Sequence, residues 1–256
     1  MCAQIKLFIL LFAIVFDAVN LTDLRLIGGA NAPKDKFNYV VKIVTLQEEE
    51  VKSLCTGAVL SSSWTITAAH CITPYLTLRI ITSFQQNFQV KHYINHVTKT
   101  NDVSMLNHEI IPLKQYGKIS AVEFKSLYGQ KCTVLGYGLT KMPTAGEPLS
   151  IPDNLQFAEM ILTDCKTLNH RMKTNTMCLV SPCKASQSTI ISGDSGGPVV
   201  HASGIVAINY GVWTFYINGK GNSGLVTPLS PNLHWIKKNI QRKQDEIDNI
   251  VNKFST

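Results

Sequence analysis

The sequence lacks the strong compositional bias that marks disordered, coiled-coil or collagen-like chains. Only 16% of its 256 residues are charged and 45% are hydrophobic, with a mean hydropathy of +0.08. Chains of those three kinds depart further from average usage. No internal repeat or low-complexity linker is present. The composition therefore predicts a folded, core-forming protein, and its length suits one large domain or two small ones.

Dense basic clusters and metal-ligand patterns are also missing. The chain has 24 lysines and arginines against 17 acidic residues, for a formal net charge of +7. Because this excess is not clustered, a heparin- or carbohydrate-binding module is a weak alternative, and no nucleic-acid partner is expected. Residues 70–102 hold no acidic cluster for calcium, and no metal-ligand spacing appears among the histidines outside the motifs below. We expect no metal and no cofactor.

Long apolar runs are absent after the N-terminus. Near the start, Lys6 precedes the apolar run Leu7–Phe16, which is the pattern of a secretory signal peptide. A membrane-spanning helix needs about 20 apolar residues, so the run is too short to span a bilayer. We therefore expect residues 1–18 to be a signal peptide cleaved near Ala18, and the mature protein to be secreted and extracellular. The alternative is a buried N-terminal strand or helix.

The cysteines are too few for a miniature disulfide scaffold. The chain has seven, and Cys2 would leave with the signal peptide. An even number in a secreted protein predicts disulfides, and spacing alone leaves fifteen pairings open. The six that remain are Cys55, Cys71, Cys132, Cys165, Cys178 and Cys183.

The chain does contain a series of short β-type segments. They are rich in Val, Ile, Thr and aromatic residues and are bounded by Gly, Asn, Ser or Pro, as antiparallel strands are. Helical spacing appears only from Asn232 onward, and an acidic turn is expected at 48–50. The pattern predicts an all-β sandwich or barrel with a C-terminal helix. Examples of the expected strands are Tyr39–Thr45, Gly57–Leu60, Trp64–Ala68, Leu76–Ile81, Thr133–Tyr137, Pro198–His201 and Gly204–Tyr210.

Three short motifs carry candidate chemistry. They are Thr67-Ala68-Ala69-His70-Cys71, Asn101-Asp102-Val103-Ser104-Met105-Leu106 and Gly193-Asp194-Ser195-Gly196-Gly197-Pro198. A histidine can take the proton of a serine hydroxyl, and glycines allow the tight backbone that exposes such a hydroxyl. With these motifs in the order His, Asp, Ser, the chain resembles the trypsin/chymotrypsin-like serine endopeptidases.

That resemblance implies a fold and a mechanism for residues 26–256. The expected fold is two six-stranded antiparallel β-barrels with a C-terminal α-helix, and the active site lies between the barrels. His70, Asp102 and Ser195 would form the catalytic triad, and the N–H groups of Gly193 and Ser195 the oxyanion hole. The resemblance also pairs Cys55 with Cys71 and Cys165 with Cys178.

The segment Arg25-Leu26-Ile27-Gly28-Gly29 resembles a zymogen activation site. Residues 19–25 would be a short propeptide, cut after Arg25 by a separate trypsin-like protease. The new ammonium of Leu26 would then pair with Asp194 and order the oxyanion loop. The other expected partners are a protein or peptide substrate and a protein inhibitor, and the enzyme is expected to be a monomer with no membrane contact.

Specificity would depend on Thr189, Gly211 and Gly224. Thr189 stands where trypsin-like members carry Asp at the pocket floor, so an apolar or aromatic P1 residue is expected. The alignment after Gly204 has two registers. In the one we favour, Asn209-Tyr210-Gly211 takes the place of the family's Ser-Trp-Gly. The Asn209 side chain then supports Asp102, the pocket wall stays open, and the aromatic and the glycine lie along the substrate backbone. In the other, Gly204-Ile205-Val206 takes the place of the family's Gly-Ile-Val, Ala207 lies beside Asp102 and Asn209 blocks the pocket wall.

The chain also departs from the family. Ile191 and His201 stand where many relatives carry cysteines, so Cys132 and Cys183 are left over and either pair with each other or stay free. These departures keep a second hypothesis open: a catalytically weak or silent homologue that acts as a regulatory binding protein.

Overall fold

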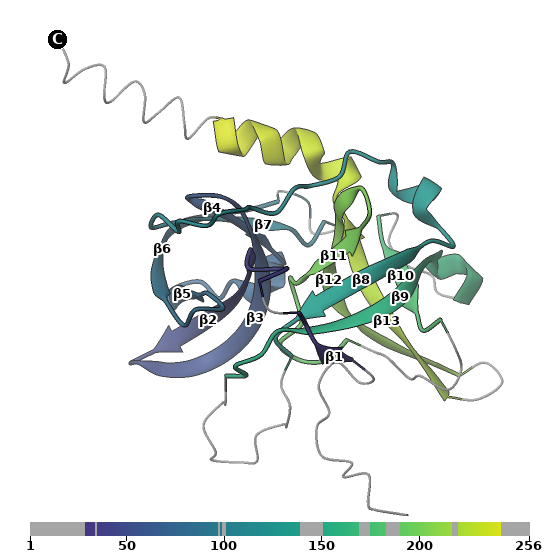
Figure 1. Ribbon diagram of the computed structural model, residues 1–256, viewed down its shortest axis with the longest axis horizontal. Coiled ribbons are helices and arrows are strands. Elements are labelled where there is room, and N and C mark those ends of the chain that lie inside the picture. Colours follow the sequence, from purple (N-terminus) through teal and green to yellow (C-terminus); the bar gives the residue numbers. More distant parts are fainter. Residues whose placement is uncertain are drawn as a thin grey trace, which may run out of the picture.

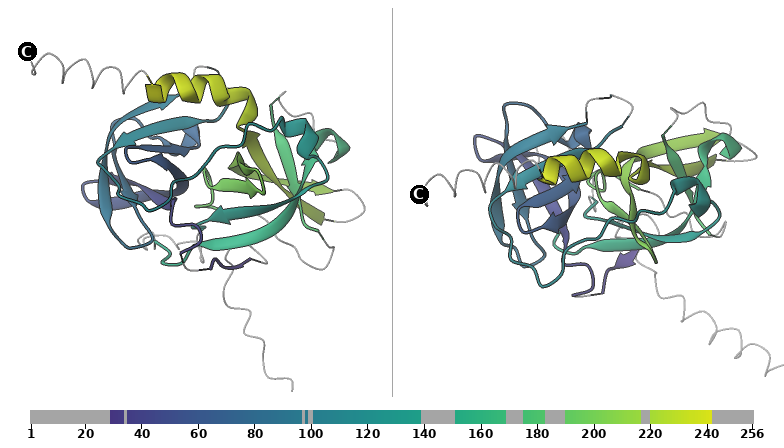
Figure 2. Two further views of the ribbon diagram at one scale, coloured as in Figure 1. Left: turned by 45° about the horizontal axis from the view of Figure 1, so that its top comes forward. Right: turned by 90° about the horizontal axis from the view of Figure 1, so that it is seen from above.

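The computed structural model describes residues 29–33, 35–96, 98, 101–138, 151–168, 175–182, 190–216 and 220–241. These residues form two antiparallel β-barrels that lie side by side, with one helix at the C-terminal end (Figure 1; Figure 2). The expected fold of two six-stranded barrels is therefore confirmed. The predicted signal peptide and propeptide lie outside the described residues.

The first barrel comes from the N-terminal half of the chain. Its six strands close in the order β2 (Val40–Gln47), β3 (Glu50–Ser61), β4 (Trp64–Thr67), β7 (Ser104–His108), β6 (Asn87–Asn95) and β5 (Thr77–Ile81). β2 and β3 are joined by Glu48 and Glu49, whose φ angles are 49° and 69°. Two successive residues with positive φ make a hairpin turn whose twist matches that of antiparallel strands. The acidic turn expected at 48–50 is thus a tight hairpin, and Glu50 begins β3.

The second barrel comes from the C-terminal half. It closes in the order β8 (Lys131–Gly136), β9 (Gln156–Asp164), β10 (Met177–Val180), β13 (Lys220–Pro228), β12 (Gly204–Tyr216) and β11 (Pro198–His201), and β1 (Ala30–Asn31) adds to β9. In β9, Ala158, Met160 and Leu162 are buried, whereas Glu159 is exposed. This period of two is what a strand with one face on the core requires.

The C-terminal helix, residues 233–241, belongs to the core of the first barrel. Ile236 is buried there, Trp235 and Ile240 pack against the same apolar cluster, and the Trp235 ring lies 4.9 Å from that of His96. The helix is the yellow segment above the first barrel (Figure 1). Its apolar face is the one that the sequence spacing predicts. No helix among the described residues is long and apolar enough to cross a membrane.

The remaining short elements are 3-10 turns. They are η1 (Ala69–Cys71), η2 (Phe124–Leu127), η3 (Cys165–Leu168) and η4 (Ser230–Asn232), and η1 carries His70.

Candidate active site

His70 and Asp102 meet because two paired strands end beside each other. β4 and β7 are antiparallel, with Thr67 opposite Ser104. His70 follows the end of β4, and Asp102 precedes the start of β7. The Asp102 carboxylate accepts one hydrogen bond from the His70 backbone N–H (2.8 Å) and one from His70 Nδ1 (2.5 Å). The pair therefore holds the proton on Nδ1 and leaves Nε2 free to accept another.

The two side chains of this pair differ in exposure. The His70 side chain is 42% exposed, and that of Asp102 is 13% exposed. The imidazole is thus open to a ligand from solvent, while the carboxylate that orients it is largely shielded.

The Cys55–Cys71 disulfide fixes the turn that carries His70. It joins η1 to β3, with the two Cα atoms 6.1 Å apart, and confirms the predicted pairing. Sγ of Cys71 lies 3.7 Å from the carbonyl oxygen of Ser195. The same disulfide therefore contacts both the histidine turn and the serine loop.

Ser195 lies in a tight, partly exposed loop before β11. Gly196 has a φ of 78°, and a Cβ at this position would collide with Thr67 Oγ1 of β4, so glycine allows the close approach. The loop is held from both barrels. The Thr56 N–H donates to Ser195 O (2.8 Å), and the Gly196 N–H donates to Asn209 O (2.7 Å).

The structure thus brings the three predicted triad residues to the junction of the barrels. Among the described side chains, no hydrogen bond joins the Ser195 hydroxyl to the His70 ring. Such contacts often tighten only when substrate binds.

Asp194 is fully buried beside a space that two glycines leave open. Its carboxylate accepts hydrogen bonds from the N–H groups of Gly138 (2.7 Å) and Ile191 (3.0 Å). A Cβ on either Gly136 or Gly138 would collide with this carboxylate. Burial raises the pKa of Asp194 to about 7, and the two hydrogen bonds oppose that rise. No basic side chain of the described residues forms an ion pair with it. Arg25 and Leu26, its predicted activation partners, lie outside the described residues.

The predicted specificity residues are only partly described. Gly211 faces open space, because no heavy atom would lie within 4 Å of a Cβ there. Gly224 is tightly packed, since a Cβ would lie 2.8 Å from Cδ1 of Ile190, which is itself buried. Thr189 lies outside the described residues. The wall around Gly224 is therefore apolar.

The contacts with Asp102 that the two registers predicted for Asn209 and Ala207 are both wrong. The Asn209 side chain is buried and donates to the carbonyls of Leu135 (3.2 Å) and Asp194 (3.1 Å), not to Asp102. Ala207 is buried in the core of the second barrel rather than beside Asp102. The pairing of β12 with β13 shifts between Asn209 and Gly211, and a bulge of this kind turns successive side chains to other faces.

The bulge brings Tyr210 against His70, a contact that neither register predicted. Its ring meets that of His70 edge-on, with the centroids 5.9 Å apart and the planes at 84°. Tyr210 is 40% exposed, so it forms part of the accessible surface beside the histidine. The sequence signal for Tyr210 was its place in Asn209-Tyr210-Gly211, which the favoured register put along the substrate backbone.

The other described cysteines form one disulfide and leave one free thiol. Cys165 and Cys178 form a disulfide, as predicted. Cys132 is a free, buried thiol that donates to Met160 O, and burial raises its pKa to about 12. Cys183 lies outside the described residues.

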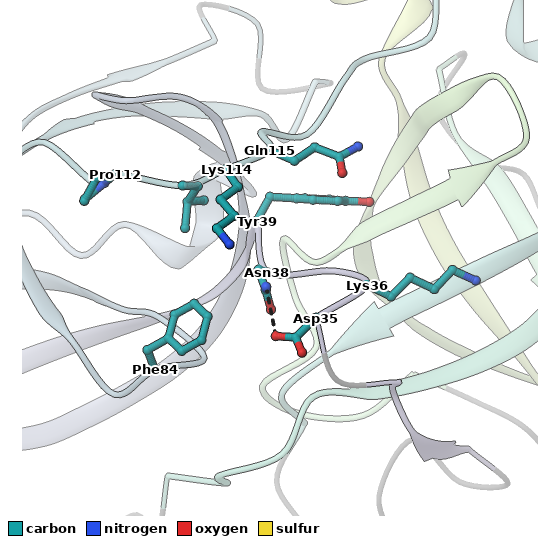
Figure 3. Close-up of a pocket in the computed structure, with 9 residues that line it drawn as sticks. Asp35, Lys36, Asn38, Tyr39, Phe84, Pro112, Lys114 and Gln115 are labelled. Carbon is teal, nitrogen blue, oxygen red and sulfur yellow. Dashed lines mark hydrogen bonds between the residues drawn. The ribbon is translucent and has the colours of Figure 1, made fainter.

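Two other features of the described residues take no part in this site. One group has potential metal ligands, Cys55, His70 and Cys71, but both sulfurs are consumed by the disulfide. A groove of about 580 Å³ lies between the segments 35–39 and 112–115, with Phe84 at its border (Figure 3). The side chain of Asn38 donates a hydrogen bond to the Asp35 carboxylate there. None of the predicted site residues lines this groove, which is bordered by Asp35, Lys36, Asn38, Tyr39, Phe84, Pro112, Leu113, Lys114 and Gln115.

Two closed six-stranded barrels with a His–Asp pair and a glycine-flanked serine at their junction define the chymotrypsin-like class. The family model described as Trypsin matches residues 26–236, so the chain belongs to the trypsin family of serine proteases.

Proteins of similar sequence agree with this assignment. The chain is 25% identical over 243 residues to Serine protease SSP1 of Scolopendra subspinipes, covering 85% of this chain and 84% of the relative. It is 29% identical over 211 residues to Kallikrein-8 of Homo sapiens, covering 74% and 78%. It is 24% identical over 235 residues to Trypsin of Sus scrofa, covering 85% and 96%.

A solved structure shares the fold. Neuropsin, a serine protease expressed in the limbic system of mouse brain, superposes with a TM-score of 0.64 at 20% identity. The match covers 83% of this chain and 98% of neuropsin.

Proposed function

We propose that the protein is a secreted serine endopeptidase that cleaves peptide bonds with His70, Asp102 and Ser195. The observation that carries the proposal is the doubly hydrogen-bonded His70–Asp102 pair beside the serine loop. An oriented imidazole with an accessible ring is what a serine hydroxyl needs in order to become a nucleophile.

In this mechanism His70 Nε2 takes the proton of Ser195 Oγ as the oxygen attacks the substrate carbonyl. Asp102 keeps the imidazole in the correct tautomer and stabilises its charged form. The N–H groups of Gly193 and Ser195 stabilise the oxyanion, and one such donor is typically worth about 3–4 kcal/mol. His70 then protonates the leaving amine, and water hydrolyses the acyl-enzyme by the same steps.

The enzyme is made as a zymogen that a cut after Arg25 activates. The cut would create an ammonium group on Leu26, and Asp194 is a buried carboxylate without a cationic partner among the described residues. Pairing of the two would stabilise the charged carboxylate and the adjoining loop. Asp194 stands between Gly193 and Ser195 in the sequence. Its pairing with the Leu26 ammonium would therefore act directly on the residues of the oxyanion hole.

The pocket favours an apolar or aromatic P1 residue. Two observations support this preference: Ile190 forms an apolar wall at Gly224, and the position at Gly211 is open. In addition, Thr189 has no charge to pair with Arg or Lys. Since the activation site ends in Arg25, a separate trypsin-like protease would make the cut. A protein inhibitor would bind at the same site as the substrate, and the enzyme would act as a monomer.

Labelling with a fluorophosphonate probe after cleavage at Arg25 tests the proposal. We expect labelling of cleaved protein, much weaker labelling of uncleaved protein, and none of a Ser195→Ala variant. Sequencing of the N-terminus must first show a free Leu26 amine. Cleaved protein that does not label would contradict the enzyme hypothesis and support the regulatory homologue instead.

A library of peptide substrates tests the pocket. Enrichment of Phe, Tyr, Leu or Met at P1 is the expected result. A strong preference for Arg or Lys would show that the role given to Thr189 is wrong.

A further inference from the structure

We propose that Thr56 of β3 is a positioning residue that aligns the oxyanion hole from the opposite barrel. This inference rests on the proposed function, because it concerns the same N–H groups of Gly193 and Ser195. Its basis is a set of hydrogen bonds in which one buried residue of the first barrel binds the carbonyls of both oxyanion residues.

Thr56 contacts the serine loop through its backbone and its side chain. Its N–H donates to Ser195 O (2.8 Å), and its hydroxyl donates to Gly193 O (2.8 Å). Thr56 is completely buried, and it follows Cys55, which the disulfide ties to the histidine turn. The residue therefore connects the rigid wall of the first barrel to both ends of the segment that carries the nucleophile.

The hydroxyl has one proton, and its environment determines where that proton goes. Thr56 Oγ1 accepts a hydrogen bond from the Tyr137 N–H (2.9 Å), so its own proton is available for Gly193 O. The next residue, Gly138, donates its N–H to the Asp194 carboxylate. The Thr56 hydroxyl thus lies between the oxyanion loop and the segment that holds Asp194.

The bonds of Thr56 restrict peptide groups that would otherwise turn easily. Gly193 has a φ of 96°, and a residue without Cβ rotates more freely than any other. Its peptide to Asp194 is bonded on both sides, because the Asp194 N–H donates to Ile191 O (3.1 Å) while Gly193 O accepts from Thr56. The peptide after Ser195 is held likewise, by Thr56 and by Asn209. These two held peptides lie on either side of the peptide that carries the Ser195 N–H, and the first of them adjoins the peptide that carries the Gly193 N–H. Fixing them therefore limits how far either donor can turn away from the point where negative charge develops.

Replacement of the hydroxyl by a methyl group tests this role. Thr56→Val keeps the shape of the side chain but cannot donate to Gly193 O or accept from Tyr137. In protein cleaved after Arg25, we expect kcat to fall about 10- to 100-fold with KM changed less than about threefold, because the hole acts in the transition state. Binding of a peptide boronic acid should weaken in parallel, and Thr56→Ser should restore most of the activity.

Thr65→Val is the matched control. Thr65 is a buried threonine of β4 whose hydroxyl bonds His108 (3.0 Å), away from the serine loop. The Thr65→Val variant loses a hydroxyl from the same barrel, as Thr56→Val does. Because that hydroxyl does not contact the serine loop, kcat should stay near that of wild type even if stability falls. Should Thr56→Val fail to fold, Thr56→Ala removes the hydroxyl without added bulk and is expected to lose the same activity.

The results separate this inference from the proposed function. If cleaved wild type labels with fluorophosphonate but Thr56→Val and Thr56→Ala retain its kcat, the positioning role is wrong. Equal losses of kcat in the Thr56 and Thr65 variants, or a change in KM alone, would also contradict it. If cleaved wild type neither labels nor cleaves peptides, the proposed function fails and the role of Thr56 fails with it.

Discussion

Asp102 acts on His70 through two separate hydrogen bonds, and the two have different consequences. The bond to the backbone N–H holds the turn η1 in place, whereas the bond to Nδ1 selects the tautomer of the ring. An amide at this position could keep the first bond, but it could also donate to Nδ1 and thereby reverse the tautomer.

Asp102→Asn should therefore fold normally and lose activity. We expect kcat at neutral pH to fall about 10⁴-fold, because Nε2 would carry the proton and could not accept one from Ser195. Hydrolysis of a peptide substrate by cleaved protein measures the loss, and thermal unfolding checks the fold. Activity within tenfold of wild type would contradict the role of this carboxylate.

The thiol of Cys132 is chemically protected by its position in β8. Burial raises its pKa to about 12, and Sγ donates to Met160 O, so little thiolate forms near neutral pH. We expect no reaction with iodoacetamide at pH 8 in native protein and full reaction in guanidinium chloride. Peptide mapping by mass spectrometry distinguishes Cys132 from Cys183, and a Cys132→Ser variant is the control. Rapid native labelling of Cys132 would show that it is accessible.

At the scale of elements, the strands that the sequence predicted are those of mainly apolar segments, although the apolar β10 was not among them. The expected segment Tyr39–Thr45 lies almost wholly within β2, and Gly204–Tyr210 is the first part of β12. The pattern did not single out β6, because Asn87, Gln89 and Lys91 are polar and the strand is only partly buried. Pairing with β5 and β7 determines β6, and such long-range pairing leaves little trace in local composition.

The site was predictable where a motif fixes the backbone and unpredictable where register decides. His70, Asp102 and Ser195 lie at strand ends or in a glycine-rich turn, so their neighbours in sequence identify them. The side chains of Asn209 and Tyr210 depend on a bulge in β12, and a shift of one residue exchanges the two faces of a strand. For that reason the contact of Tyr210 with His70 emerged only from the structure.

The C-terminal helix contributes to stability through one face. Ile236 is buried against the first barrel, whereas Lys238 on the same helix is exposed. Ile236→Ala should lower the free energy of unfolding by about 2–4 kcal/mol, because it leaves a cavity in a packed core. Lys238→Ala should change it by less than about 0.5 kcal/mol. Urea unfolding measures both, and equal effects would contradict the packing of this helix.

For the whole molecule, the two barrels are not independent. The main apolar cluster of the first barrel also contains Leu135, Tyr137, Ile205 and Ile208 from the second half of the chain. Thr56 and the serine loop add polar bonds across the same boundary. We therefore expect the barrels to unfold together rather than one by one.

Asp194 couples the stability of the uncleaved molecule to pH. Its pKa is raised by burial from 3.8 to about 7, so the folded chain keeps a proton that the unfolded chain releases. Between about pH 4 and pH 7 the unfolded state binds fewer protons, and stability must fall as pH rises through this range. Urea unfolding of uncleaved protein should show Asp194→Asn more stable than wild type at pH 8 and nearly equal at pH 4.

Glu49→Gln removes an exposed carboxylate and is the control in that comparison for the loss of one negative charge. An Asp194→Asn variant that is less stable than wild type at pH 8 would mean that the carboxylate already has a cationic partner before cleavage. After the cut, pairing with the Leu26 ammonium would reverse the trend, because it favours the charged carboxylate.

The division of the proposed triad between the barrels has a consequence for biosynthesis. The first barrel, with His70 and Asp102, emerges from the ribosome before Ser195 has been translated, and domains generally begin to fold in that order. Helix 233–241, which helps to fill the core of the first barrel, is translated after every strand of both barrels. A growing chain therefore holds the His70–Asp102 pair before Ser195 exists, and we expect its first barrel to stay incompletely packed until translation is nearly finished.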